Sequence, residues 1–166
     1  YLQLMSLMVN ALDPDENGVR HTPLSLTCSG EEGRNVVAVD WVSDVMVRLF
    51  MTPEAHCDTY HIAPDVQINA KQLIDYCSAY YNATGVVFGV EEHGLNDWDR
   101  LAHEQLDVYK DYMENDPFFD MTNTRKFTAD LPCPVIDQDA IHRYIRFGEE
   151  DKWGKRRLPP HEQPID

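Results

Sequence analysis

Apolar residues recur at helical spacing from the start of the chain. The stripe of Leu2, Met5, Val9 and Leu12 predicts an amphipathic helix over residues 1–12. Natural helices usually begin with a capping residue, and none precedes this one. We therefore expect further sequence upstream of Tyr1.

The same periodicity predicts five more helices, over residues 40–51, 69–81, 97–115, 123–131 and 137–148. Asp40, Asn69 and Asp137 stand where three of these helices begin. A side-chain oxygen at such a position can accept a hydrogen bond from a free N–H group of the first turn, so we predict all three as N-caps. The candidate caps of the other two helices are Asn96 or Asp97, and Thr122 or Asn123.

Short apolar and β-branched runs predict strands over residues 22–28, 35–39, 59–63 and 86–90, and residues 117–121 form an extended connection. Helices that alternate with strands indicate the α/β class, but about four strands are too few for a doubly wound sheet. We therefore expect part of an α/β fold over residues 1–148. A charged, proline-containing tail follows over residues 149–166.

The composition narrows the possible partners. The chain of 166 residues is 43% hydrophobic, which is ordinary for a globular protein, and its net charge is −15. This charge repels phosphate backbones and anionic membrane surfaces, so we expect neither nucleic acid nor membrane as a partner. The four cysteines form no Cys-x-x-Cys pair, which favours reduced thiols and a cytoplasmic location.

Several familiar sites are missing from the sequence. The segment from Gly30 to Gly33 has only two glycines, encloses two glutamates and precedes no helix, so we interpret it as a turn between strands rather than a phosphate cradle. His56, Cys57 and His61 do not have the spacing of a metal-ligand template, and His103 has no second histidine four residues later. No P-loop and no Gly-x-Ser-x-Gly elbow occurs.

Two further groups of residues have a simple structural interpretation. The acidic clusters, including Glu149 to Asp151, are expected to form a solvated face. Met5 and Met8 are expected in the core, although methionines can also line an apolar tunnel for a ligand.

Three segments in order carry a resemblance to a known family. They are Asn35-Val-Val-Ala-Val-Asp-Trp-Val-Ser-Asp44, Thr59-Tyr-His-Ile-Ala-Pro64 and Pro117-Phe-Phe-Asp-Met-Thr-Asn-Thr-Arg125. Together they resemble the C-terminal half of extended short-chain dehydrogenases/reductases, in the branch of thioester reductases and fatty-acyl reductases. The resemblance covers roughly residues 1–148.

The resemblance implies a partial Rossmann-type fold, with C-terminal strands and helices plus a small substrate-side lobe. Asp40 would then be the structural cap of a helix on the nucleotide-binding sheet, and Tyr1, Met5 and Met8 would contact substrate. The family's Gly-rich turn and its Tyr-x-x-x-Lys pair are both absent. We therefore assign no catalytic, cofactor-binding or metal-binding residue, and expect NAD(P) only in the complete enzyme.

On this interpretation the chain is the substrate-binding portion of an NAD(P)-dependent oxidoreductase that reduces an acyl thioester or a related acyl substrate. It would not be catalytic alone. Its expected partners are an upstream nucleotide-binding half and a small-molecule or carrier-bound acyl substrate, and self-association is also expected. The alternatives are a non-catalytic docking module, or a portion of a sugar-nucleotide epimerase or dehydratase with the same fold.

Overall fold

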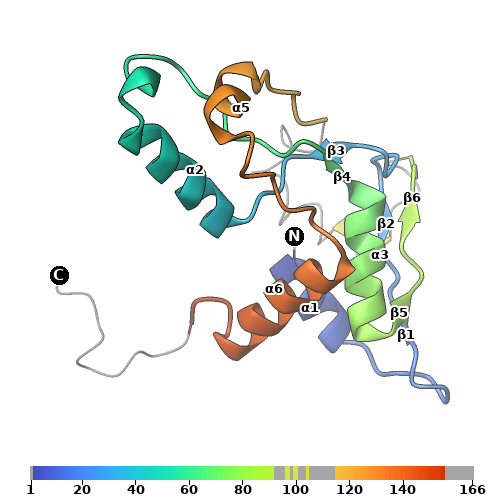
Figure 1. Cartoon of the computed structure of the whole chain (residues 1–166). Coiled ribbons are helices and arrows are strands. Elements are labelled where there is room, and N and C mark those ends of the chain that lie inside the picture. The colour runs from blue at the N-terminus through green and yellow to red at the C-terminus, as the bar shows by residue number, and fades with distance from the viewer. Residues whose placement is uncertain (1, 92–95, 98, 101–103, 105–114, 156–166) are drawn as a thin grey trace.

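The computed structural model describes residues 2–91, 96–97, 99–100, 104 and 115–155 (Figure 1). The helices are α1 (Leu2–Asn10), α2 (Val39–Met51), α3 (Ala70–Tyr81), α5 (Thr122–Thr128) and α6 (Gln138–Glu150), with a short 3-10 helix η1 (Pro53–Ala55). The strands are β1 (Arg20–His21), β2 (Ser25–Leu26), β3 (Gly33–Arg34), β4 (Ile68–Asn69), β5 (Ala83–Thr84) and β6 (Val87–Phe88). The mixed α/β class predicted from the sequence is confirmed.

Strand β1 pairs with β5 and β2 pairs with β6, both in parallel, and we call these two short pairs together the parallel ribbon. Arg20 lies opposite Ala83, 63 residues later in the sequence, and Ser25 lies opposite Val87, 62 residues later. The chain from β1 to β2 therefore holds one residue more than the chain from β5 to β6 beside it. Pro23, which has no N–H group to donate, lies at this irregularity. The third pair, β3 with β4, is antiparallel.

The first of two apolar cores joins α1, α3 and α6 to the ribbon, and we call this part the helical body. Its buried side chains are Met5, Met8, Val9, Leu24, Cys77, Tyr81, Ile141 and Ile145. These residues come from both ends and the middle of the sequence. The chain therefore closes the helical body by bringing its first and last described helices together.

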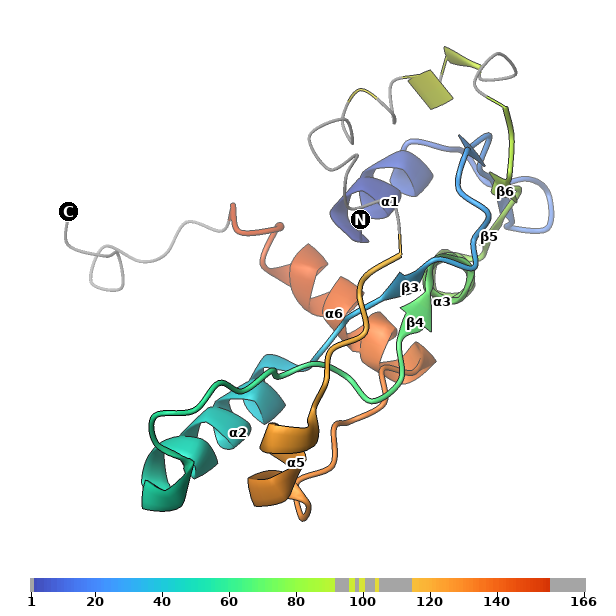
Figure 2. The same cartoon turned by 90° about the horizontal axis from the view of Figure 1, so that it is seen from above.

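The second core lies in what we call the α2–α5 lobe. Trp41 and Val45 of α2 pack there with Ala63 and Met121, on the segments that lead to β4 and into α5. Figures 1 and 2 show α2 and α5 together at one end of the molecule, with β1 and β5 at the opposite end. The two cores are thus separate clusters, linked by chain that includes β3 and β4.

Helices were predicted well where the local signals were strong. The helices expected at 1–12, 69–81 and 137–148 are α1, α3 and α6. Asn69 forms a reciprocal capping box with Gln72, and Asp137 accepts a hydrogen bond of 2.8 Å from the N–H of Ala140. Helix α6 continues through Glu150, beyond residue 148. Most of the helix expected at 97–115 lies outside the described residues.

Two predicted caps are wrong. Helix α2 begins at Val39 with Ala38 as its N-cap, so Asp40 lies inside the first turn and accepts a hydrogen bond from Trp41 N, 2.9 Å away. A carboxylate there still complements the positive end of the helix dipole. Helix α5 begins at Thr122 with Met121 as its N-cap, and the Asp120 carboxylate accepts the bond from Thr122 N at 2.9 Å.

The predicted strands were less accurate. Residues 22–28 and 86–90 do lie in the parallel ribbon, as β2 and β6 with their flanking hydrogen bonds. Residues 35–39 and 59–63, however, belong to no ladder; α2 already begins at Val39. A strand needs a neighbour for its backbone groups, and within the described residues these two segments have none.

The core of the helical body gives a direct test of stability. Ile145 of α6 is fully buried, whereas Phe147 two residues later is 69% exposed. We expect Ile145→Ala to lower the free energy of unfolding by about 2–5 kcal/mol, because it removes buried methylenes and leaves a cavity. Phe147→Ala is the control and should change it by less than about 1 kcal/mol. Urea unfolding followed by circular dichroism measures both, and equal losses would contradict the assigned core.

Candidate functional site

A half-buried carboxylate, that of Glu149, joins the three helices of the helical body. Its oxygens accept hydrogen bonds from Tyr81 Oη at 2.8 Å, Tyr80 Oη at 3.1 Å and Ser6 Oγ at 3.3 Å. Asn10 Nδ2 extends the network with a bond of 3.3 Å to Ser6 Oγ. We call these five residues the Glu149 network. It draws on α1, α3 and α6, so it fixes their relative register.

The acid–base properties of the Glu149 network follow from its environment. Burial raises the pKa of Tyr81, and the hydrogen bond and charge of Glu149 raise it further, against an opposing contribution from Ser6. Burial and Glu149 also raise the pKa of Tyr80. Both phenols therefore stay protonated near neutral pH and donate to the carboxylate. The network can hold helices in place, but it supplies no tyrosinate base.

Glu149 shows where the sequence interpretation was wrong. We expected it on a solvated acidic face, but its carboxylate accepts bonds from side chains 68, 69 and 143 residues away in sequence. Contacts between residues so far apart in the sequence cannot be predicted from local periodicity. The signal that could have found the site is the Tyr80–Tyr81 pair at the end of an amphipathic helix, because a buried phenol needs a partner for its hydroxyl.

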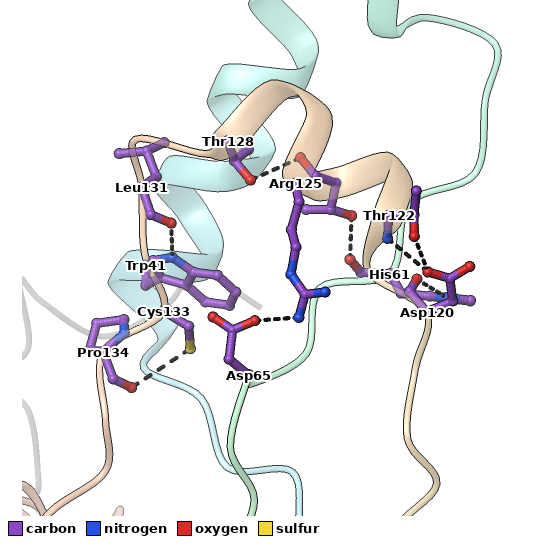
Figure 3. A network of polar contacts seen from close by, with 11 residues as sticks. Trp41, His61, Asp65, Asp120, Thr122, Arg125, Thr128, Leu131, Cys133 and Pro134 are labelled. Atoms are coloured by element: carbon purple, nitrogen blue, oxygen red, sulfur yellow. Dashed lines mark hydrogen bonds and ion pairs between the residues drawn. The ribbon is translucent and has the colours of Figure 1, made fainter.

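A second network lies in the α2–α5 lobe and holds residues 59–65 against α5 (Figure 3). Thr124 Oγ1 donates to the carbonyl of His61, and Asn123 Nδ2 donates to that of Thr59 at 3.1 Å. Arg125 forms an ion pair of 2.6 Å with Asp65. These contacts come from side chains of α5 and reach backbone or carboxylate groups of the segment. The segment is therefore held by side chains along one edge.

Cys133 lies near the same network but has no sign of activation. Its Sγ is 3.7 Å from the carbonyl oxygen of Pro134, and burial together with the charge of Asp65 raises the pKa of the thiol. A nucleophilic cysteine needs a lowered pKa. Trp41 nearby donates its indole N–H to Leu131 O at 3.1 Å, which ties α2 to the chain after α5 (Figure 3).

Of the three residues predicted to contact substrate, two are buried and the third is not described. Met5 and Met8 are 4% and 7% exposed and belong to the core of the helical body. This is the position of packing residues, and their contact with substrate stays a prediction. Tyr1 lies outside the described residues. Among the side chains of α1 whose exposure is described, Leu7 is apolar and 59% exposed.

The turn at Gly30 to Gly33 contains its own anion. The Glu32 carboxylate accepts hydrogen bonds of 2.8 Å from the backbone N–H groups of Ser29 and Gly30, and another from the Ser29 hydroxyl. Burial alone would raise the pKa of Glu32, but these bonds hold it below its usual value. The N–H groups that could cradle a phosphate are already occupied, so the turn does not fit a dinucleotide.

The described part of the chain contains neither a cluster of metal ligands nor a candidate membrane-spanning helix. No group of three or more His, Cys, Asp or Glu side chains is arranged to hold a metal ion there. His56 Nε2 bonds Phe50 O and His61 Nδ1 bonds Asp120 O, so the two histidines have separate partners. None of the described helices combines the length and the apolar character needed to cross a membrane.

Comparison with known proteins shows a structural similarity. No protein family and no curated protein matches the chain in sequence. Among solved structures, it is similar to the terminal R domain from the myxalamid PKS-NRPS biosynthetic pathway, with a TM-score of 0.61 and 19% identity. The match covers 95% of this chain and 41% of that one. The two share a fold over nearly all of this chain, which spans about two-fifths of the length of that domain.

The Glu149 network predicts a dependence of stability on pH. The unfolded Tyr81 ionises near its ordinary pKa of 10.0, whereas the folded one stays protonated because its pKa is raised. The stability that this phenol contributes is thus present below pH 10 and lost as the pH rises further. Tyr81→Phe should therefore lose less stability than the wild type between about pH 9 and pH 11. Urea midpoints across this range measure the slopes; parallel slopes would contradict the buried phenol.

Proposed function

We propose that this chain is the substrate-side part of an NAD(P)-dependent reductase of the extended short-chain dehydrogenase/reductase type, acting on an acyl thioester. The observation that carries the proposal is the likeness to a terminal R domain over 95% of the chain. The three ordered sequence segments that resemble the thioester-reductase branch support the same assignment independently. The activity belongs to the complete protein, of which this part supplies substrate contacts.

The cofactor would be held by another part of that enzyme. In the described residues the glycine turn is filled by the Glu32 carboxylate, and the sequence has no Tyr-x-x-x-Lys pair. A further negative charge at this turn would face Glu31 and Glu32. The residues of this chain therefore do not fit NAD(P), and their contribution is to shape the site for the acyl group.

Helix α1 is the element that we propose to face the acyl group. The Glu149 network and the core fix this helix on one side through Ser6, Met5 and Val9. Leu7 is exposed on its surface and offers an aliphatic contact that a long acyl chain could cover. Leu7 thus replaces the buried Met5 and Met8 as the first side chain of α1 to test.

The experiment compares the 166-residue chain with the native polypeptide that carries this sequence. Calorimetry should detect no NADPH binding to the chain alone at micromolar concentrations. The native polypeptide should oxidise NADPH when octanoyl-CoA is added and release free CoA thiol. NADPH binding by the chain alone, or epimerisation or dehydration of a sugar nucleotide in place of thioester reduction, would overturn the proposal.

The role of α1 is tested by substitution in the same native polypeptide. Leu7→Gln should raise KM for octanoyl-CoA several-fold with kcat little changed, because it weakens binding of the acyl chain. Val135→Gln is the matched control, since Val135 is also an exposed aliphatic residue, at 74%, and lies between α5 and α6. An equal rise of KM in both variants would contradict contact between α1 and the acyl chain.

A further inference from the structure

The buried face of α6 ends at a glycine that is covered by an indole ring. Ile141, Ile145 and Gly148 recur at helical spacing and are all buried. A Cβ placed on Gly148 would lie between 2.5 and 2.8 Å from three atoms of the half-buried Trp153 ring, closer than a real Cβ approaches any neighbour. The indole therefore takes the place of the side chain that Gly148 lacks, and it extends the packed face to the end of the helix.

Trp153 reaches Gly148 through a turn that is bonded closely to the end of α6. The N–H groups of residues 151–153 donate to the carbonyls of residues 147–149, at distances between 2.6 and 3.1 Å. A helix otherwise leaves such carbonyls without a partner at its C-terminal end. The turn is thus attached to the last residues of α6, which include Glu149.

The turn holds two residues with side chains in a left-handed backbone conformation. The φ angles of Lys152 and Trp153 are +53° and +54°, and that of Gly154 is +80°. Glycine adopts such angles freely, but a Cβ atom is crowded there. A bulky residue keeps this conformation only where its surroundings hold it, and such positions are typical of ligand clamps and switches. A large side chain at position 148 would fill the same space permanently, whereas an indole on a strained turn can leave it.

The last turn of α6 also carries the carboxylate that holds α1. Helices α1 and α6 lie side by side (Figures 1 and 2). Glu149 is the neighbour of Gly148 in the chain and accepts the bond of 3.3 Å from Ser6 Oγ. Leu7, the exposed residue that we propose to contact the acyl group, follows Ser6 on α1. A shift of the last turn of α6 is therefore transmitted to α1 through one carboxylate.

We propose that Trp153 is a positioning residue for α1. While its indole covers Gly148, it holds Glu149 where the carboxylate fixes α1; when the strained turn opens, α1 is released. This positioning role rests on the proposed function only in assigning α1 to the acyl group. An acyl chain that binds the fixed form of α1 must favour the packed indole by the same factor, because coupling between two sites is reciprocal. The state of the turn thus sets the affinity of the reductase for the acyl chain.

A simple helix cap is the alternative role for this turn, and its consequences differ. A cap would influence the amides at the end of α6 and leave those of α1 unchanged. Glycine inside a helix is less favourable than alanine, so Gly148→Ala would then stabilise α6. If the indole has to lie on Gly148, the same substitution instead displaces the ring, because the new Cβ would occupy its space. The two roles therefore predict opposite effects of one substitution.

The test measures amide hydrogen exchange, without substrate, in the native polypeptide that carries this sequence. Trp153→Ala and Gly148→Ala should each speed the exchange of residues 6–8 about tenfold, because each loosens the support of α1. The double variant should exchange no faster than either single variant, since both act through the same contact. Phe147→Ala is the matched control: it removes an exposed ring from the same turn of α6 and should leave α1 unchanged.

Three results would overturn the positioning role. They are unchanged exchange of α1 in Trp153→Ala, slower exchange of α1 in Gly148→Ala, and an acceleration that extends equally through α3. The last of these would make Trp153 an ordinary core residue. Trp153→Phe keeps a ring at the contact and should restore most of the protection that Trp153→Ala loses; a variant with phenylalanine that exchanges as fast as the alanine variant also overturns the role.

Thioester reduction is measured separately in the same variants. Trp153→Ala should raise KM for octanoyl-CoA several-fold and leave kcat little changed, because it alters binding of the acyl chain and no reacting group. Faster exchange of α1 in a polypeptide that reduces no thioester would keep the positioning role and reject the proposed function. Thioester reduction with wild-type exchange and wild-type KM in Trp153→Ala would do the reverse.

Discussion

The half-buried carboxylate of Glu149 is the constraint on which the helical body depends. A carboxylate removed from water is costly unless donors replace the lost hydration. Two tyrosines from α3 and a serine from α1 provide these donors. Helix α6 must therefore lie where all three can reach it, and the apolar contacts of Ile141 and Ile145 then close around that arrangement. The apolar contacts contribute most of the stability, and the polar network selects the register.

The α2–α5 lobe is organised by a different kind of interaction. Its irregular segment at 59–65 is held by side chains of α5, including the Arg125–Asp65 ion pair, and not by a backbone ladder. Exposed ion pairs contribute little to stability, so the small core around Trp41 and Val45 must supply most of it. Among the described residues, this lobe also carries the largest group of exposed apolar side chains, on α2. It is thus the less self-contained of the two parts.

The sequence predicted helices better than strands for a physical reason. Helix signals are local: Asn69 and Gln72 lie three residues apart, and Asp137 bonds Ala140 at the same spacing. A strand is completed only by its neighbour. Residues 59–63 have the composition of a strand, yet one of their edges faces side chains and the other faces nothing described. The Glu149 network was not predicted because its donors are brought together by tertiary packing. The cap predicted at Asp40 lies two residues from the observed N-cap, Ala38, which is within the usual uncertainty of helix boundaries.

In the reductase that we propose, the cofactor and the acyl group would contact different parts of the molecule. A dinucleotide needs free N–H groups at a turn, and here the Glu32 carboxylate already takes those of Ser29 and Gly30. An acyl chain needs apolar surface on a rigid support, and α1, fixed by Ser6 and its buried methionines, provides such a support. The described residues of the helical body form a core of their own, and the α2–α5 lobe has a separate core around Trp41 and Val45. We therefore expect that a substitution of Leu7 on α1 can alter the proposed substrate contact without unfolding the α2–α5 lobe.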